Sequence, residues 1–235
     1  MISIIIPAHN EKQNLDKLLP YLQELIKVDD TEILISISAS NSDCTAFEKL
    51  NSKIIFYKCP TNGRAIQMNY AANKAKGDIL VFLHADVIPP INFIEDIKAT
   101  INNKYEAGFF SYKFDKESFF LNINSSFTAK DGIFTGGGDQ CLFIKKDVFF
   151  QLGKFNEAQV IMEDFEFFKR MKKEKVNYKI IKNNLIVSAR KYETNSYLKV
   201  NISNLVMVVL FNLGYPANKL KSLHSKLLKM PYSTK

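Results

Sequence analysis

The chain has 235 residues, 46% hydrophobic and 24% charged, a balance typical of a soluble globular protein and unlike that of disordered or fibrous chains. No acidic residue follows Glu193, so most of the net charge of +8 lies in the last fifth of the chain. This asymmetry favours peripheral contact with an anionic membrane surface over nucleic acid, although lysines that only aid solubility would give the same pattern. The lysines concerned are Lys199, Lys219, Lys221, Lys226, Lys229 and Lys235.

The sequence contains no linker-like or repeated segment, and we predict one main domain, 1–195, with a C-terminal helical extension, 196–235, packed on it. Three cysteines, Cys44, Cys59 and Cys141, lie far apart, and their odd number favours a reducing cytosolic compartment over a disulfide framework. The N-terminal run MISIIIPAHNEK has no basic region before its apolar stretch, which predicts a first strand rather than a signal peptide.

Strand and helix patterns alternate over the first hundred residues. Apolar, β-branched runs predict strands at 2–6, 32–38, 54–57 and 79–83. Apolar residues at helical spacing predict helices from residue 11 to about 26 and over 64–76, with a further helix from about residue 91. This order predicts an α/β fold with a mostly parallel sheet covered by helices.

The second half is less regular. We predict strands at 108–114 and 141–144, a helix at 163–173, strands at 178–181 and 185–188, and closing helices at 196–213 and 217–229. The first closing helix is apolar nearly all round, but its longest apolar run, 205–211, is far shorter than the roughly 18 residues that span a bilayer, so we expect it to be buried or interfacial. The aromatic-rich segment 109–127 is expected to pack in the core, with a cleft wall as the alternative.

Four polar clusters follow predicted strands or begin predicted helices: 7–11 (PAHNE), 84–86 (HAD), 138–140 (GDQ) and 162–164 (MED). Ligands of open α/β sheets bind outside the carboxyl ends of strands, so Asp86 is placed to hold a divalent cation against a diphosphate, the alternative being a turn cap. Glu163 and Asp164 begin a predicted helix, where the dipole favours negative charge, so capping is the alternative to catalysis for that pair.

In this order and at these separations, the clusters resemble those of the family-2 glycosyltransferases with the GT-A fold, and most closely a small bacterial branch with FLHAD, GDQ, MED and SAR motifs. The motifs stand here at 82–86, 138–140, 162–164 and 188–190, with GRAIQMN at 63–69 in addition. The resemblance runs from Ile2 to the C-terminal helices. It implies a GT-A (Rossmann-like), mixed, mostly parallel central sheet flanked by helices, with C-terminal helices.

The resemblance implies an inverting hexosyltransferase that moves a sugar from a nucleotide-diphosphate donor, with a UDP-sugar favoured, to a hydroxyl of a glycan or lipid-linked acceptor at the cytosolic face of the membrane. Asp164 would be the general base, oriented by Glu163, and Asp86 would ligate Mg²⁺ or Mn²⁺. The implied nucleotide-sugar site comprises Pro7, His9, Glu11, Ser38, Arg64, His84, Ala85 and Asp86, and the implied acceptor side Asp139 and Gln140.

Two positions depart from the family's pattern. Ser38 stands where relatives carry an aspartate that contacts the nucleotide base, and His84 replaces the first acid of the DxD metal-binding motif, as is usual in this branch. Asp43 could partly compensate for Ser38, although a turn cap is the favoured interpretation. Arg190 and Lys191 could reach the diphosphate or lie on the surface after the last strand.

Two other functions compete with glycosyl transfer. A nucleotidyltransferase of similar sheet architecture should carry a glycine-rich, basic loop after the first strand, which PAHNEKQN does not supply. A non-catalytic nucleotide-sugar-binding or scaffold protein could have lost activity through changes such as Ser38, but the retention of Asp86, Glu163 and Asp164 counts against it.

Overall fold

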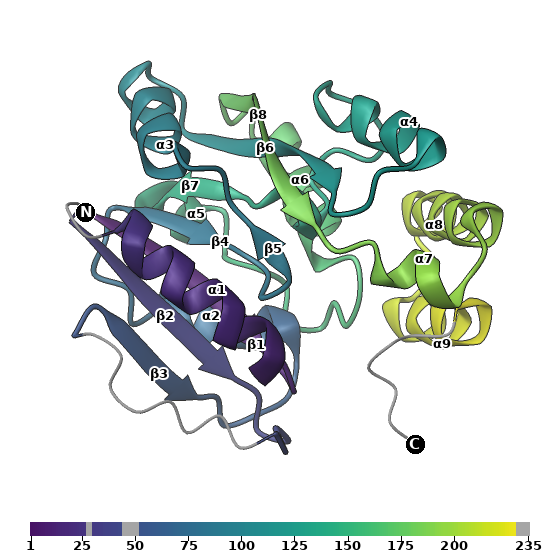
Figure 1. The fold of residues 1–235 in the computed structure, drawn as a ribbon, viewed down its shortest axis with the longest axis horizontal. Coiled ribbons are helices and arrows are strands. Elements are labelled where there is room, and N and C mark those ends of the chain that lie inside the picture. The colour runs from purple at the N-terminus through teal and green to yellow at the C-terminus, as the bar shows by residue number, and fades with distance from the viewer. Residues whose placement is uncertain (27–29, 44–51, 229–235) are drawn as a thin grey trace.

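The computed structural model describes residues 1–26, 30–43 and 52–228 (Figure 1). Cys44 and two of the lysines noted above, Lys229 and Lys235, lie outside the described residues. The described chain forms an α/β structure around one eight-stranded sheet, and α7, α8 and α9 lie together at one end of it (Figure 1).

The sheet has the strand order β3-β2-β1-β4-β7-β6-β8-β5. Strands β1, β2, β3 and β4 pair in parallel, as do β6 and β8, whereas β7 runs antiparallel to β4 and β6, and β5 antiparallel to β8. The predicted mixed, mostly parallel sheet is therefore confirmed. The strands are β1 (Ile2–Ala8), β2 (Thr31–Ile37), β3 (Ile54–Lys58), β4 (Ile79–Phe82), β5 (Val87–Ile88), β6 (Ala107–Phe114), β7 (Phe143–Lys145) and β8 (Tyr178–Val187).

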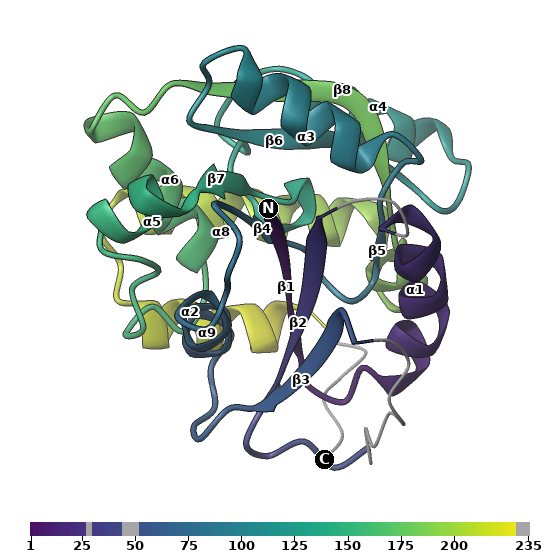
Figure 2. The same cartoon turned by 90° about the vertical axis from the view of Figure 1, so that its left-hand side faces the viewer.

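Helices cover both faces of the sheet, because side chains of successive strand residues point to opposite faces. Ile4 and Ile6 of β1 belong to a buried cluster with α1 and α3, whereas Ile5 belongs to a second cluster with α2, α5 and α6. Figure 2 shows α1 and α2 on opposite sides of β1 and β2. The helices are α1 (Lys12–Leu25), α2 (Arg64–Ala72), α3 (Phe93–Asn102), α4 (Phe119–Thr128), α5 (Lys146–Gln151), α6 (Glu163–Lys173), α7 (Arg190–Thr194), α8 (Tyr197–Asn212) and α9 (Ala217–Leu227).

Several local predictions change in the second half. The two strands predicted at 178–181 and 185–188 form one strand, β8, because its pairing with β6 continues through a register shift between Phe110 and Tyr112. The strand predicted at 141–144 begins at Phe143, because Cys141 has a left-handed φ of 51°. The core assignment of segment 109–127 holds for Phe109 and Phe110 but is wrong for its second part, where α4 exposes Phe119, Phe120 and Phe127.

The two C-terminal helices pack on each other and on the domain. Val200 and Met207 of α8 and Leu220 of α9 are buried, so both helices contribute to the core. In the part of the chain that the structure describes, every helix is too short or too polar to cross a bilayer. Helix α9 ends at Leu227, two residues before the predicted end, which lies outside the described residues.

Candidate active site

A cleft of about 290 Å³ lies beyond the carboxyl ends of β1 and β4, which are on the same edge of the sheet because these strands are parallel. Its walls come from segments far apart in the sequence, from the end of β1 to α8. Most of the predicted donor-site residues, together with Asp139, meet there. The predicted residues that line the cleft are Pro7, His9, Glu11, Arg64, His84, Ala85, Asp86 and Asp139.

One end of the cleft, which we call the cation end, consists of Glu11, Asp86 and Arg190. Arg190 is the first residue of α7, and its Nη2 lies 2.8 Å from Asp86 Oδ2 and 3.6 Å from Glu11 Oε1. Burial raises the pKa of the Glu11 carboxyl, and the hydrogen bond from Asn14 and the charge of Arg190 offset part of that rise. Arg190 thus bridges the end of strand β4 and the start of α1.

A second charged group, which we call the base end, consists of Arg64, Glu163 and Asp164. Of these, Arg64 lines the cleft, whereas Asp164 lines a small cavity beside it. Glu163 and Asp164 begin α6, and Arg64 begins α2. Arg64 Nε donates a hydrogen bond to Glu163 Oε1, and Arg64 Nη2 lies 4.0 Å from Asp164 Oδ2. Arg64 is therefore bonded to the first carboxylate and only within charge range of the second.

The two adjacent carboxyls at the base end titrate in opposite directions. Burial alone would raise the pKa of Glu163, but the charge and hydrogen bond of Arg64 lower it below its usual value. Burial and the neighbouring charge of Glu163 raise the pKa of Asp164 to about 6, because Arg64 offsets them only in part. Asp164 can accordingly release and take up a proton near neutral pH.

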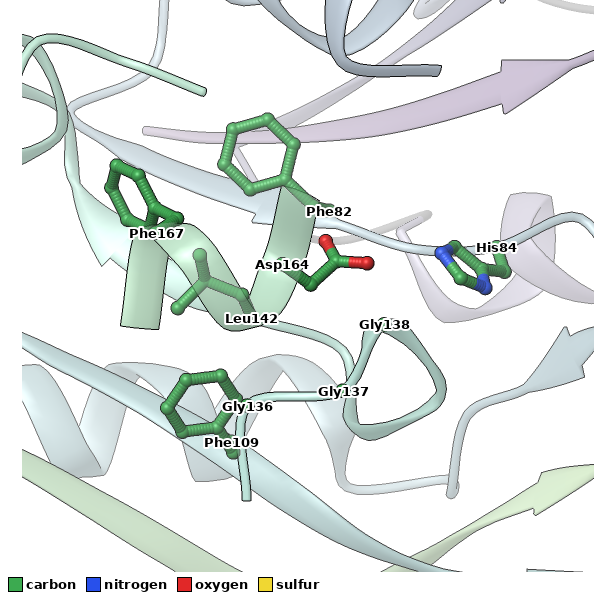
Figure 3. Close-up of a pocket in the computed structure, with 9 residues that line it drawn as sticks. All are labelled: Phe82, His84, Phe109, Gly136, Gly137, Gly138, Leu142, Asp164 and Phe167. Atoms are coloured by element: carbon green, nitrogen blue, oxygen red, sulfur yellow. The ribbon is translucent and has the colours of Figure 1, made fainter. Parts of the chain in front are cut away.

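His84 connects the base end to the segment of Gly136, Gly137 and Gly138, which we call the glycine loop. Its Nδ1 lies 3.6 Å from Asp139 Oδ1. Burial disfavours a charged His84, but the neighbouring Asp139 carboxylate raises the pKa of His84. Burial would raise the pKa of Asp139, but His84, Lys191 and Arg64 lower it to about 2. A Cβ on Gly138 would lie 2.4 Å from His84 Cε1 and 2.6 Å from Asp164 Oδ2, so any larger residue here would displace one of these side chains. Figure 3 shows the Asp164 carboxylate pointing toward the His84 ring beside this loop. A cavity of about 10 Å³ beside them has room for about one water molecule.

Four predicted site residues do not line the cleft: Asp164 lines the small cavity beside it, and Ser38, Gln140 and Glu163 support the cleft from behind. Ser38 is 2% exposed, and its Oγ lies 2.6 Å from Nδ1 of His9, which faces the cleft. Gln140 is also 2% exposed: its Oε1 accepts from the Gly136 backbone and its Nε2 donates to the carbonyl of Thr128. Glu163, 1% exposed, reaches the cleft only through Arg64. Asp43 accepts from the backbone N–H of Lys12, the first residue of α1, as a cap would.

The sequence analysis missed several residues that line the cleft. Gln67 Nε2 donates to the carbonyls of Ala8 and Ser36 and so ties together the ends of β1 and β2. Asn204 is one of the few polar residues in the otherwise apolar helix α8, a signal that could have identified it. Val187 and Tyr192 were also missed, whereas Ser188 belongs to the SAR motif, and Tyr112 and Phe114 belong to segment 109–127, for which a cleft wall was the alternative.

Solved structures of glycosyltransferases share this fold. Residues 1–349 of S. aureus TarS match with a TM-score of 0.63 at 16% identity, over 96% of this chain and 70% of that one. The chain spans 42% of the chain in another S. aureus TarS structure. The mannosyltransferase PcManGT from Pyrobaculum calidifontis, solved with GDP-Man and Mn²⁺, matches with a TM-score of 0.63 at 13% identity, over 96% of this chain and 69% of that one. At such identities these matches establish a common fold only.

A Drosophila protein, β1,4-galactosyltransferase 7, solved with manganese, UDP-Gal and xylobiose, matches with a TM-score of 0.52 at 14% identity, over 77% of this chain and 65% of that one. No curated protein matches the sequence significantly. The family model described as glycosyl transferase family 2 matches residues 3–178, from the first strand of the sheet to the start of β8, a span that includes Glu11, Arg64, Asp86 and Asp164 but not Arg190. Because that match covers well over half of the chain, the protein belongs to glycosyl transferase family 2.

Proposed function

We propose that this family member is an inverting hexosyltransferase of the branch with FLHAD, GDQ, MED and SAR motifs, which moves a sugar from a nucleotide-diphosphate donor, with a UDP-sugar favoured, to a hydroxyl acceptor. The observation that supports this proposal best is the convergence of Glu11, Asp86, Arg64 and Asp139, from four separate segments, on one cleft. The neighbouring structures contain UDP-GlcNAc, GDP-Man or UDP-Gal, which are donors of the proposed class.

In the proposed donor site, Pro7, His9 and Glu11 border the nucleotide at the end of β1. Ser38 would act indirectly, because its hydroxyl is bonded to the His9 ring and is buried behind it. The uncharged Ser38 therefore positions His9. The nucleobase of the donor would contact the imidazole of His9 and not a carboxylate. His84 and Ala85 complete the wall beside Asp86.

The cation end fits a divalent cation shared with the donor. Arg190 Nη2 stands in for such a cation, since it lies within 2.8 Å of Asp86 and 3.6 Å of Glu11. Carboxylate oxygens suit Mg²⁺ or Mn²⁺, and because the described residues contain no group of three or more His, Cys, Asp or Glu that could hold a metal, diphosphate oxygens and water would complete the shell. A cation bound there offsets the charge of the leaving nucleoside diphosphate. Arg190 and Lys191 add positive charge to the same wall.

The base end supports direct displacement. As the acceptor oxygen bonds to the anomeric carbon and the bond from that carbon to the diphosphate oxygen breaks, the acceptor proton passes to the Asp164 carboxylate. Glu163 cannot compete for that proton, because Arg64 is bonded to it and stabilises its charged form. Asp139 would line the acceptor side, and Gln140 would hold the glycine loop in place.

For the acceptor we propose a glycan or lipid-linked hydroxyl at the cytosolic face of the membrane. Residues 196–235 would form a basic extension of the 1–195 domain, in peripheral contact with that membrane. The support for contact with a lipid surface is the charge of this extension, which is complementary to that of anionic headgroups.

Calorimetric titration tests the donor assignment. The full-length protein is titrated with UDP, GDP, CDP and dTDP, each with and without Mn²⁺. We expect UDP to bind, and to bind more tightly with Mn²⁺, and we expect the matching UDP-sugar to be hydrolysed slowly without an acceptor. Failure of all four nucleotides to bind would reject the proposal in favour of a scaffold with a degenerate site, and binding without any turnover would favour a non-catalytic sensor. Preference for nucleoside triphosphates over diphosphates would favour a nucleotidyltransferase.

A further inference from the structure

Helices α4 and α8 have an unusual composition for surface elements. The ten residues of α4, FFLNINSSFT, include no charged side chain, and the sixteen residues of α8 include only Lys199. An exposed helix of a soluble protein normally carries charged residues on its outer face. Here the outer faces are apolar instead.

Each helix exposes a continuous apolar strip. On α4 the exposed apolar residues recur at about one helical turn, and Phe119 and Phe127 among them are 75% and 65% exposed. On α8 the spacing is again one turn, and Leu198 and Ile202 are 68% and 60% exposed. The strips, which together we call the α4–α8 face, comprise Phe119, Phe120, Ile123 and Phe127 of α4 and Leu198, Ile202, Leu205 and Val209 of α8.

The two helices lie side by side (Figure 1). Asn124 of α4 donates to Asn201 of α8 at 2.9 Å and accepts from the hydroxyl of Tyr197 at 2.8 Å. The rings of Phe120 and Tyr197 pack with their centroids 4.9 Å apart. These contacts hold the two helices together, so the exposed strips lie on neighbouring elements.

The α4–α8 face adjoins the wall of the cleft that Tyr112, Phe114 and Asn204 form. Tyr112 and Phe114, at the end of β6, line the cleft and lead directly into α4. Asn204 of α8 also lines it, between the exposed Ile202 and Leu205 of the same helix. The helix that walls the cleft is therefore also the helix that presents the apolar strip.

The charge around the face is predominantly positive. Lys199 is exposed on α8 itself, and α9, packed against α8, exposes Lys219, Lys221 and Lys226. Of the acids near the ends of α4, Asp131 is paired with Lys172, and Glu117 is exposed just before the helix. Glu193 is paired with Lys116. An apolar strip flanked by lysines matches the hydrocarbon boundary and anionic headgroups of a bilayer.

We propose that the α4–α8 face inserts into the interface of an anionic bilayer, with its apolar side chains among the acyl chains and the flanking lysines at the headgroups. This contact stands independently of the proposed function. Its consequence, that an acceptor carried by a lipid meets the cleft at the membrane surface, rests on that function. The proposal moves the main membrane contact from the basic tail to two helices that contain almost no charge.

Vesicle flotation tests the proposal with matched variants. The full-length protein is mixed with phosphatidylcholine vesicles with or without phosphatidylglycerol, and the variants are Phe119→Gln on α4, Ile202→Gln on α8 and the control Ile91→Gln. Ile91 is 75% exposed and shortly precedes α3, and Figure 1 shows α3 on the opposite side of the view from α4 and α8. We expect binding that phosphatidylglycerol strengthens, an affinity loss of about tenfold in each of the first two variants, and no loss in the control.

Three outcomes would overturn the proposal: failure of the parent protein to float with either vesicle, equal losses in all three variants, or equal binding to both kinds of vesicle. Light scattering tests whether a second copy of the chain covers the face instead. If the parent protein is a dimer that does not bind vesicles, and Phe119→Gln and Ile202→Gln convert it to a monomer, the partner is a second copy of the chain. UDP binding is measured on the same samples. Flotation without UDP binding would leave the membrane contact intact and reject the proposed function instead.

Discussion

The base end and the cation end use the same pairing chemistry to opposite effect. At the base end, Arg64 is hydrogen-bonded to one nearly inaccessible carboxylate, Glu163, and leaves the adjacent Asp164 with a raised pKa. At the cation end, Arg190 lies between two carboxylates, Asp86 and Glu11, of which Asp86 is 23% exposed to the cleft. The comparison teaches that an arginine bound to one acid can tune a neighbouring acid, whereas an arginine shared by two acids marks a position for a cation.

Replacement of the base should give the largest effect. Asp164→Asn removes the only group at the base end with a pKa near 6, and we expect turnover to fall by about a thousandfold with UDP affinity unchanged. The control is Asp147→Asn, in which an exposed acid in the first turn of another helix, α5, is neutralised in the same way. Unchanged turnover in Asp164→Asn would remove the assignment of Asp164 as the base.

The same variant should also be more stable at neutral pH. The folded-state pKa of Asp164 is about 6, against 3.8 for a free aspartate, so ionisation of this group costs stability as the pH rises from about 4 through 6. Asp164→Asn abolishes that cost and should raise the free energy of unfolding at pH 7 by up to about 3 kcal/mol. Urea denaturation of both proteins at pH 4 and pH 7 measures it, and an equal difference at the two pH values would contradict the raised pKa.

Removal of the Asp86 charge at the cation end should cause the second-largest loss of turnover. Asp86→Asn is expected to lower turnover by about a hundredfold and to abolish any strengthening of UDP binding by Mn²⁺, because one of the two carboxylates facing the cation position is lost. Asp78→Asn is a matched control, since Asp78 precedes strand β4 as Asp86 follows it and is 89% exposed. Mn²⁺ dependence that survives in Asp86→Asn would show that Asp86 does not hold the cation.

A methyl group in the glycine loop should cause an intermediate loss of turnover, because it disturbs the base end only. Gly138→Ala would place a Cβ within 2.6 Å of Asp164 Oδ2 and His84 Nε2, so one of these side chains must move. We expect turnover to fall about tenfold, less than the hundredfold that a displacement of about 1 Å can cost, with UDP affinity unchanged. Equal losses of turnover and UDP affinity would show that the loop also shapes the donor site.

The smallest change in rate is expected from Glu163→Gln, which alters the pH profile instead. Turnover of the parent protein should rise with pH to half its maximum near pH 6, because the base must be deprotonated. Loss of the Glu163 charge favours ionisation of Asp164, so the midpoint should move to lower pH, with less than about a twofold change at pH 7 because the base is already ionised there. Glu166→Gln, which loses an ion pair with Arg170 in the same helix, should keep the midpoint near pH 6.

The sequence predicted best those features that depend on neighbours in the chain. Helix α6 matches its predicted bounds, 163–173, because acids begin it, basic residues end it and the apolar spacing is regular. Helix α4 was missed because its aromatic side chains face outward and give no polar outer face, and β5 because two residues are too short to form a pattern. The polar clusters identified most of the cleft, but not its pairing: Arg190 meets Asp86 across 104 positions, and Ser38 and Gln140 turned out to be buried supports.

The separation of Arg190 from its two partners also bears on the order in which the protein is made. Glu11 and Asp86 lie in the first half of the chain and follow β1 and β4, which pair with one another in the sheet. The guanidinium that bridges them is added only after β8, so a nascent chain carries both acids without this counter-ion until α7 emerges. The contact spans 104 positions, so the cation end is complete only when the segment after β8 has folded against the end of β4.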